Sequence, residues 1–219
     1  MMRRFGILLA LALIALNAPA ADAADIVGRG SIGGSGGIMK FTSGDDFGEG
    51  NLRFIGQAVF KYNFSDRWAG VLESGWGWNN YEDDREDADT LATVIPTTLG
   101  IEYRMRYGES SVWPHIGAGA GLYTLGVKDT YRSWARDRET NARLVWTSPG
   151  LYGKLGGEYL FENGASVNVD ILYHAIFSEN TDDYPDAWGN QSTSFFEFRV
   201  GANYYFTLKG SGPGDGAEE

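Results

Sequence analysis

The chain contains two histidines, His115 and His174, and they are its clearest candidates for proton-transfer chemistry. A histidine beside a carboxylate can act as a general acid or base, and Asp170 lies on the same side of an alternating segment as His174. The alternative is that both histidines belong to an internal polar network. We favour the network, because no paired carboxylates can be placed at a shared rim, and we expect that the protein is not an enzyme.

A second candidate site is an acidic cluster within residues 81–90. Dense carboxylate oxygens can bind Ca²⁺, but the segment lacks the glycine and terminal glutamate spacing of a helix–loop–helix calcium site. We therefore expect a solvated acidic loop, with no metal and no cofactor. The cluster consists of Glu82, Asp83, Asp84, Glu86, Asp87 and Asp89.

Charge and cysteine content exclude further classes of function. The formal net charge is −11, so nucleic acid is not expected as a partner. The chain has no cysteine, which excludes disulfides, thiolate metal sites and a lipoprotein anchor.

The candidate residues are carried by eight segments in which apolar and polar side chains alternate. Successive side chains of a β-strand point to opposite faces, so this alternation predicts strands with one apolar and one polar face. In the last segment, Phe196, Phe198 and Val200 alternate with Glu197 and Arg199. The predicted segments are 26–39, 52–64, 68–81, 91–106, 112–127, 144–161, 166–178 and 193–206.

The connectors between these segments are alternately short and long. Short turns at one end and long polar loops at the other are typical of an outer-membrane barrel. The pattern therefore predicts an all-β fold, an eight-stranded antiparallel up-and-down transmembrane β-barrel. The short connectors are 65–67, 107–111 and 162–165, and the long ones lie near 40–51, 82–90, 128–143 and 179–192.

A soluble two-sheet sandwich is the main alternative fold, because it shows the same alternation with its apolar face inward. Segment length favours the barrel, since each segment has at least 13 residues, whereas strands of soluble sheets usually have about 5–6. Aromatic residues also gather at both ends of the apolar face, such as Phe64 and Trp68 at one end and Trp76 and Phe177 at the other. Spanning barrels carry two such girdles.

Residues 1–23 are predicted to form a cleaved signal peptide. Arg3 and Arg4 precede an apolar stretch, 5–16, that is too short to cross a membrane as a helix. Small residues permit cleavage between Ala21 and Asp25. Twin-arginine export is the alternative, but the rest of its motif is missing. We expect the barrel to occupy residues 24–208 in the cell outer membrane, followed by a flexible tail, 209–219.

The polar face of the segments predicts a charged lumen. Eight strands leave an interior about wide enough for side chains to fill, and unpaired buried charges are costly. We therefore expect a network of ion pairs, with Gly117, Gly119 and Gly121 making room for long side chains. A narrow water path is the alternative. The predicted network consists of Arg29, Arg53, Lys61, Glu73, Glu102, Arg104, His115, Lys154, Glu158, Asp170, His174, Glu197 and Arg199.

Two strands carry motifs known from a family. Pro114 is followed by Gly117, Gly119 and Gly121, and the last strand contains Arg199, Gly201, Tyr204 and Phe206. In these motifs the chain resembles the small OmpA-type outer-membrane β-barrel family, which includes the opacity-like proteins. The resemblance implies that Arg199, Gly201, Tyr204 and Phe206 form the signal recognised by the barrel-assembly machinery. The chain departs from the family pattern by continuing past Phe206 to Glu219.

Together these features favour a structural or surface-interaction role, such as envelope integrity or adhesion. A narrow outer-membrane pore is the alternative, and a lipid-modifying barrel enzyme is a weaker one. Expected partners are outer-membrane lipid and lipopolysaccharide, the barrel-assembly machinery, and a surface ligand bound by the loops. Aromatic and arginine residues in the long loops, such as Trp134 and Trp188, suit either ligand recognition or anchoring among lipid headgroups.

Overall fold

The structure, a computed structural model, describes residues 26–43, 52–81, 90–105, 110–128, 133–134, 136, 141, 143, 145–177 and 193–208. Its strands are β1 (Arg29–Ser43), β2 (Arg53–Asn63), β3 (Trp68–Tyr81), β4 (Thr90–Arg104), β5 (Val112–Lys128), β6 (Val145–Leu160), β7 (Ala165–Ile176) and β8 (Thr193–Thr207). No helix among these residues has the length and apolar character needed to cross a membrane.

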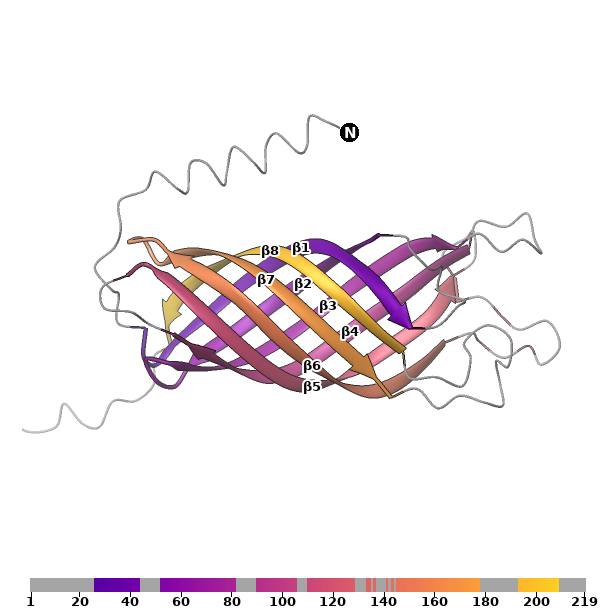
Figure 1. Ribbon diagram of the computed structural model, residues 1–219, viewed down its shortest axis with the longest axis horizontal. Helices are drawn as coiled ribbons and strands as arrows, with labels where there is room; N and C mark the ends of the chain where they lie inside the picture. Colours follow the sequence, from indigo (N-terminus) through magenta and orange to yellow (C-terminus); the bar gives the residue numbers. More distant parts are fainter. Residues whose placement is uncertain are drawn as a thin grey trace, which may run out of the picture.

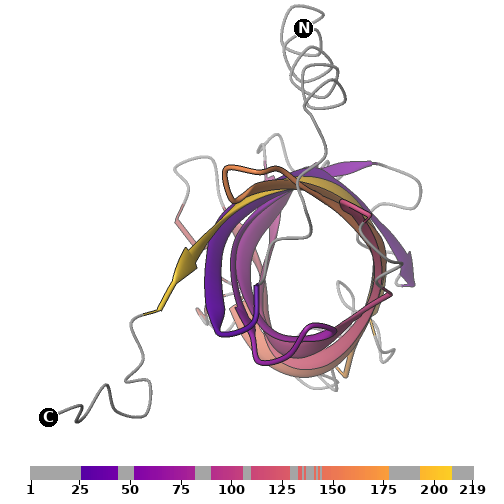
Figure 2. The ribbon, with the colours of Figure 1, turned by 90° about the vertical axis from the view of Figure 1, so that its left-hand side faces the viewer.

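The eight strands form one closed antiparallel barrel. Each strand pairs with its neighbours in sequence, and β1 pairs with β8 to close the ring. Figure 1 shows the strands inclined to the long axis, and the view along the axis shows the closed wall (Figure 2). The predicted eight-stranded up-and-down barrel is therefore confirmed.

The predicted strand bounds differ most from the structure at the first strand. The prediction placed it at 26–39, whereas β1 is Arg29–Ser43. Its end is extended because Lys40 and Phe41 pair with Phe196 and Phe195 of β8. Its start is later because residues before Arg29 form a turn, in which Gly28 adopts a φ of 74°. The other bounds lie closer, and β3 begins and ends where the sequence predicted.

Side chains of opposite parity lie on opposite sides of the barrel wall. Leu99 is 66% exposed, whereas its neighbour Thr98 is 3% exposed. Outward positions are mostly apolar, as a lipid-facing surface requires, and inward positions carry the ionisable residues. The strands thus supply two chemically different surfaces from one alternating sequence.

We call the two ends of the barrel the short-turn end and the long-loop end, after the connectors predicted there. At the short-turn end, the β6–β7 turn is fixed by Gly164, whose φ is 80°. The Gly164 carbonyl accepts a hydrogen bond of 2.8 Å from the Tyr205 amide of β8. This turn therefore also holds β8, which supplies several of the lumen side chains.

Candidate functional site: a sealed, charge-balanced lumen

The lumen is lined by buried ionisable side chains. Among the described residues, five cationic and five anionic side chains and both histidines are at most 5% exposed. The formal charges of the ten therefore cancel. The cations are Arg53, Lys61, Arg104, Lys154 and Arg199, and the anions are Glu73, Glu102, Glu158, Asp170 and Glu197.

One part of this network is centred on two lysines. Lys61 Nζ lies 3.3 Å from Glu102 Oε1 and 3.2 Å from Glu158 Oε2. Lys154 Nζ lies 2.7 Å from Glu102 Oε2, and Arg104 Nε lies 3.1 Å from Glu102 Oε1. Lys61, Glu102 and Lys154 come from β2, β4 and β6, which are not neighbouring strands. These ion pairs therefore cross the lumen and occupy it.

A second part is centred on Arg199 of β8. Its Nη2 and Nη1 donate to the two Glu73 carboxylate oxygens at 2.6 and 2.9 Å, and its Nε donates to Asp170 Oδ2 at 3.2 Å. Its Nη1 also donates to Gln57, whose amide nitrogen donates to Glu197 at 3.0 Å. A bidentate pair of this kind fixes both distance and orientation.

His115 is held by this network and has no path to the surface. Its Nε2 lies 2.7 Å from Asp170 Oδ1 and 3.9 Å from Glu102 Oε2. The side chain is 0% exposed. The structure thus brings Asp170 to His115, and not to His174 of its own strand, and it places this pair inside a filled lumen.

His174 lies nearer the long-loop end, among aromatic rings. Its ring stacks on Phe195 with centroids 4.3 Å apart and on Tyr152 with centroids 5.8 Å apart. Its Nδ1 lies 2.9 Å from the Tyr123 hydroxyl, and its Nε2 lies 3.4 Å from Glu197 Oε2. The two histidines thus belong to the same internal network, through different carboxylates.

Inward glycines allow the long side chains to approach the wall. A Cβ on Gly156 would lie 2.1 Å from Asp170 Oδ1 and 2.7 Å from His115 Nε2, so any side chain there would displace this pair. The glycines predicted to face inward also adjoin larger side chains. Gly117 faces Lys154, and Gly119 faces the ring of Tyr152.

An apolar cluster closes the lumen at the long-loop end, and we call it the long-loop cap. Every strand except β3 contributes to it, and Phe195 packs against Phe41 and Tyr123 with centroids 5.3 and 6.4 Å apart. Its members are Met39, Phe41, Ile55, Val94, Tyr123, Leu125, Ile176 and Phe195, with Trp146 packed against them.

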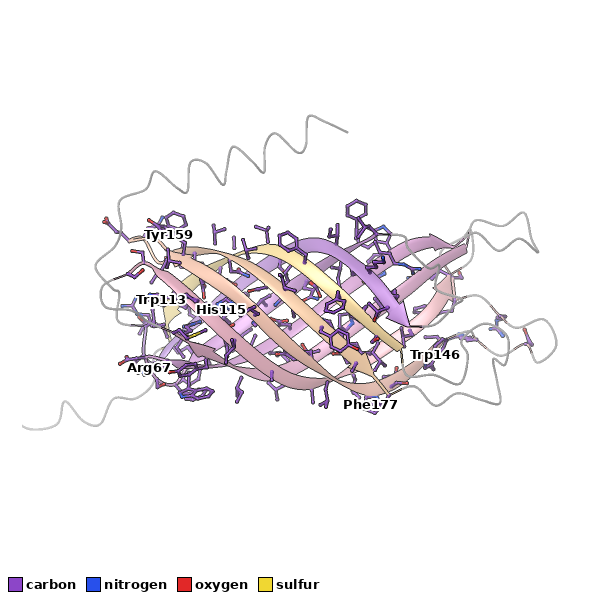
Figure 3. The ribbon with its side chains drawn as sticks, viewed as in Figure 1. Arg67, Trp113, His115, Trp146, Tyr159 and Phe177 are labelled. Atoms are coloured by element: carbon purple, nitrogen blue, oxygen red, sulfur yellow. The ribbon has the colours of Figure 1, made fainter. Side chains whose placement is uncertain are left out.

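A smaller cluster, the short-turn cap, closes the other end. It consists of Ile26, Trp113, Leu160 and Tyr205, each at most 3% exposed. The Trp113 indole donates a 2.7 Å hydrogen bond to the Ser110 carbonyl, and the guanidinium of Arg104 lies 5.6 Å from its ring. Figure 3 shows His115 between Trp113 at this end and Trp146 at the other. The charged middle is therefore enclosed on both sides.

Two residues of the predicted network lie apart from its centre. Arg53 is buried at the long-loop end, where its guanidinium lies 4.9 Å from the Phe41 ring centroid. Arg29 is at the short-turn end, only partly buried, and takes part in none of the ion pairs found among the described residues. The other eleven residues are buried and joined by the contacts above.

Several polar members of the network were not in the predicted set. Gln57 bridges Glu197 and Arg199, and the Tyr205 hydroxyl donates to Glu158 Oε1 at 2.8 Å. Asn63 accepts from Arg104, and Asn168 donates to Asp170 at 2.7 Å. Their inward parity was visible in the sequence, but neutral side chains were not weighed as partners for charges.

From the sequence we expect no G-x-S-x-G nucleophile elbow, although residues 33–37 have the letters of that pattern. Ser35 lies within β1 and pairs with Gln57 of β2 and Gly201 of β8. It therefore sits in an extended strand, and not at the strand-to-helix turn that exposes a nucleophile.

The acidic cluster at 82–89 lies outside the described residues. Among the residues that the structure describes, no group of metal-binding side chains was found.

Comparison with known families decides the class of this barrel. A model of the family described as outer membrane protein beta-barrel domain matches residues 8–206. The chain belongs to this family. It is a small eight-stranded barrel of the cell outer membrane, as the OmpA-type resemblance implied. No curated protein sequence matched the chain.

Solved structures of other outer-membrane barrels share the fold. Neisserial surface protein A is 16% identical, with a TM-score of 0.57, over 82% of this chain and 99% of that protein. OprG of Pseudomonas aeruginosa is 19% identical, with a TM-score of 0.54, over 85% and 99%. The attachment invasion locus protein Ail of Yersinia pestis, in complex with the heparin analogue sucrose octasulfate, is 14% identical, with a TM-score of 0.53, over 82% and 99%. At these identities the similarity concerns the fold.

Proposed function

We propose that this protein is a structural, non-conducting barrel that anchors its long loops at the outer surface of the outer membrane. The closed lumen is the observation that carries this proposal. Two apolar caps enclose ion pairs that cross the lumen from alternate strands. A conducting barrel needs a continuous water path, whereas the central charged side chains of this lumen form ion pairs across it.

The main alternative is a narrow pore, and it is tested by conductance. The full-length mature protein, inserted into planar bilayers, is expected to give no discrete current steps, while a known porin inserted in the same way does. Steps of uniform size, with an ion selectivity that changes in Glu102→Gln, would contradict the proposal. Boiling-dependent gel mobility of the same preparation establishes that the barrel is folded.

A lipid-modifying enzyme is less well supported, because both histidines are at most 1% exposed. The corresponding test replaces His115 and His174 by glutamine and compares the lipid composition of outer membranes. We expect no change. A lost or altered lipid species, with barrel abundance unchanged, would favour an enzyme.

The proposed presentation of loops follows from the general orientation of such barrels, whose short turns are periplasmic and whose long loops are extracellular. An epitope tag inserted within 182–190 should be labelled by antibody on intact cells. The matched tag in the short turn, at Asn163, should be labelled only after permeabilisation. The opposite result would reverse the orientation and remove the surface role.

The four residues of the proposed assembly signal belong to β8, the strand that closes the ring. Tyr204 is 56% exposed on the outer wall, Gly201 is buried, and Arg199 is in the lumen network. Recognition by the barrel-assembly machinery is supported by this lipid-facing aromatic surface. Tyr204→Ala is expected to lower the amount of folded barrel in the outer membrane, measured against the similarly exposed Tyr173→Ala of β7.

A further inference from the structure

The outer wall of the barrel carries a lysine held between two tryptophans. Lys128 is the last residue of β5, and its Nζ lies 4.9 Å from the ring centroids of both Trp76 and Trp134. Trp76 lies on β3, where its ring is 5.5 Å from that of Trp78. Trp134 pairs with Lys128 through an isolated β-bridge. We call these four residues, with Thr93 between them, the outer-wall cluster.

Thr93 gives this cluster a buried and unsatisfied polar atom. Its neighbour Val94 faces the lumen in the long-loop cap, so Thr93 faces the outer wall. It is nevertheless only 1% exposed. The register places it opposite Trp78 on β3 and Gly126 on β5. Its hydroxyl has no hydrogen-bond partner among the described residues, which is unfavourable for a buried group unless a ligand supplies the partner.

The lysine contributes a positive charge at the same place. Lys128 takes part in none of the ion pairs among the described residues, and its ammonium is held by two aromatic rings. Cation–π contacts leave ammonium hydrogens free to donate to an anion. Interfacial anchoring alone would explain a lysine and tryptophans at this height, but it does not explain a buried hydroxyl without a partner.

The chemistry of the cluster selects the ligand. A phosphate oxygen accepts hydrogen bonds from an ammonium and from a hydroxyl, and the exposed faces of Trp76 and Trp78, 41% and 39% exposed, are flat apolar surfaces suited to a sugar ring. The cluster lies on the lipid-facing wall at the long-loop end, so its ligand arrives from the outer leaflet of the membrane.

We propose that the outer-wall cluster binds the phosphorylated sugar headgroup of an outer-leaflet saccharolipid. Lys128 contacts the phosphate and the tryptophans flank the sugar, while the Thr93 hydroxyl donates to the phosphate once the side chains that bury it move aside. This inference names residues for the proposed lipopolysaccharide contact. It rests on the outer-membrane location and on the proposed orientation of the long loops, and not on the closed lumen, so it can fail while the conductance and tag-labelling results stand.

The test is a titration of the full-length mature protein in detergent micelles with bis-phosphorylated lipid A, followed by native mass spectrometry. Lys128→Met is expected to weaken binding about tenfold, and Thr93→Val by several-fold, because each loses a donor to the phosphate. Lys128→Arg should retain binding because it keeps the charge. If Lys128→Arg binds as weakly as Lys128→Met, or if all variants bind like the native protein, the proposal is wrong.

Matched controls come from the same wall. Lys40 faces outward on β1 opposite Phe196, and Thr97 faces outward on β4 with its hydroxyl 3.0 Å from that of Ser74. Lys40→Met and Thr97→Val should leave binding unchanged, and equal losses in these variants would show only a general charge or polarity effect. Boiling-dependent mobility confirms that each variant is folded.

Two further probes separate the ligand's parts. Dephosphorylated lipid A is expected to bind about tenfold more weakly than the phosphorylated form, and equal binding would exclude phosphate recognition. Soluble glucosamine phosphate should not displace the lipid. If it competes as well as lipid A does, the site recognises a soluble sugar phosphate, and the lipid proposal is overturned.

Discussion

The middle of the lumen and its two ends are built on opposite principles. In the middle, each charge depends on particular partners, as Arg199 depends on Glu73 and Asp170. At the ends, the side chains belong to two hydrophobic clusters, in which ring packing and apolar contact predominate. The two regions therefore contribute different interactions to the barrel. The caps keep water out, which strengthens electrostatic interactions between the enclosed charges, and the ion pairs link strands that are not neighbours in the wall.

The strongest way to break this arrangement is to remove one central charge. Arg199→Met leaves Glu73 and Asp170 without their shared cation, and breaking a buried pair in this way costs about 3–5 kcal/mol. The free energy of unfolding, measured by urea titration in lipid vesicles, should fall by the upper part of that range. The double variant Glu73→Gln/Arg199→Met should recover part of the loss. No recovery would mean that lost packing, rather than stranded charge, causes the effect.

A cap residue should cost less than the central arginine. Leu160→Ala removes a buried side chain from the short-turn cap, and such a truncation costs about 2–5 kcal/mol. We expect about 2–3 kcal/mol by the same urea titration, because the cap lies at the mouth of the barrel, where water can fill the space. A loss equal to that of Arg199→Met would remove the distinction between middle and ends.

The boundary between the two regions is tested at Tyr123, which belongs to the long-loop cap and also contacts His174. Tyr123→Phe keeps the ring and removes the hydroxyl that lies 2.9 Å from His174 Nδ1. Leaving a buried group unsatisfied costs about 1–3 kcal/mol, and we expect the lower part of that range. Phe195→Leu, which alters the stacked ring and leaves this hydrogen bond, is the matched control. If Tyr123→Phe has no effect, the histidine is held by stacking alone.

The smallest effect is expected on the outer wall. Ser74 and Thr97 share a 3.0 Å hydrogen bond between exposed side chains. Hydrogen bonds of this kind in membranes contribute about 0.6 kcal/mol, so Ser74→Ala should change the unfolding free energy by about that amount. A change as large as that of Tyr123→Phe would mean that the outer wall is as specific as the lumen.

The fold could be predicted from the sequence because the signal is local. Alternation within 52–64, for example, places Arg53 and Lys61 on one face and Phe54 and Phe60 on the other, as the structure does. The end of β1 was misplaced because it depends on pairing with β8, which lies more than 150 residues away. Local periodicity does not contain that information.

The site was predictable only as a set of residues, and not as an arrangement. Parity assigns Lys61, Glu102 and Lys154 to the lumen, but their mutual contacts depend on the stagger of the strands around the barrel. The caps were not predicted, because their members, such as Leu125 and Phe195, come from different strands and meet only through the stagger of the barrel. The outer-wall cluster joins β3, β4 and β5, and no single strand reveals it.

The seam between β1 and β8 also determines the order in which the molecule can be completed. Arg199 and its partner Glu73 are 126 residues apart in the chain, and Gln57 reaches Glu197 across 140 residues. Such long-range contacts form late, since their loops must close first. Until β8 arrives, Glu73 lacks its bidentate arginine and has only Lys154, whose Nζ lies 3.5 Å away. Closing the ring and completing the ion pairs of Glu73 are therefore one event, which makes an intermediate with seven inserted strands and a dry interior an unstable species.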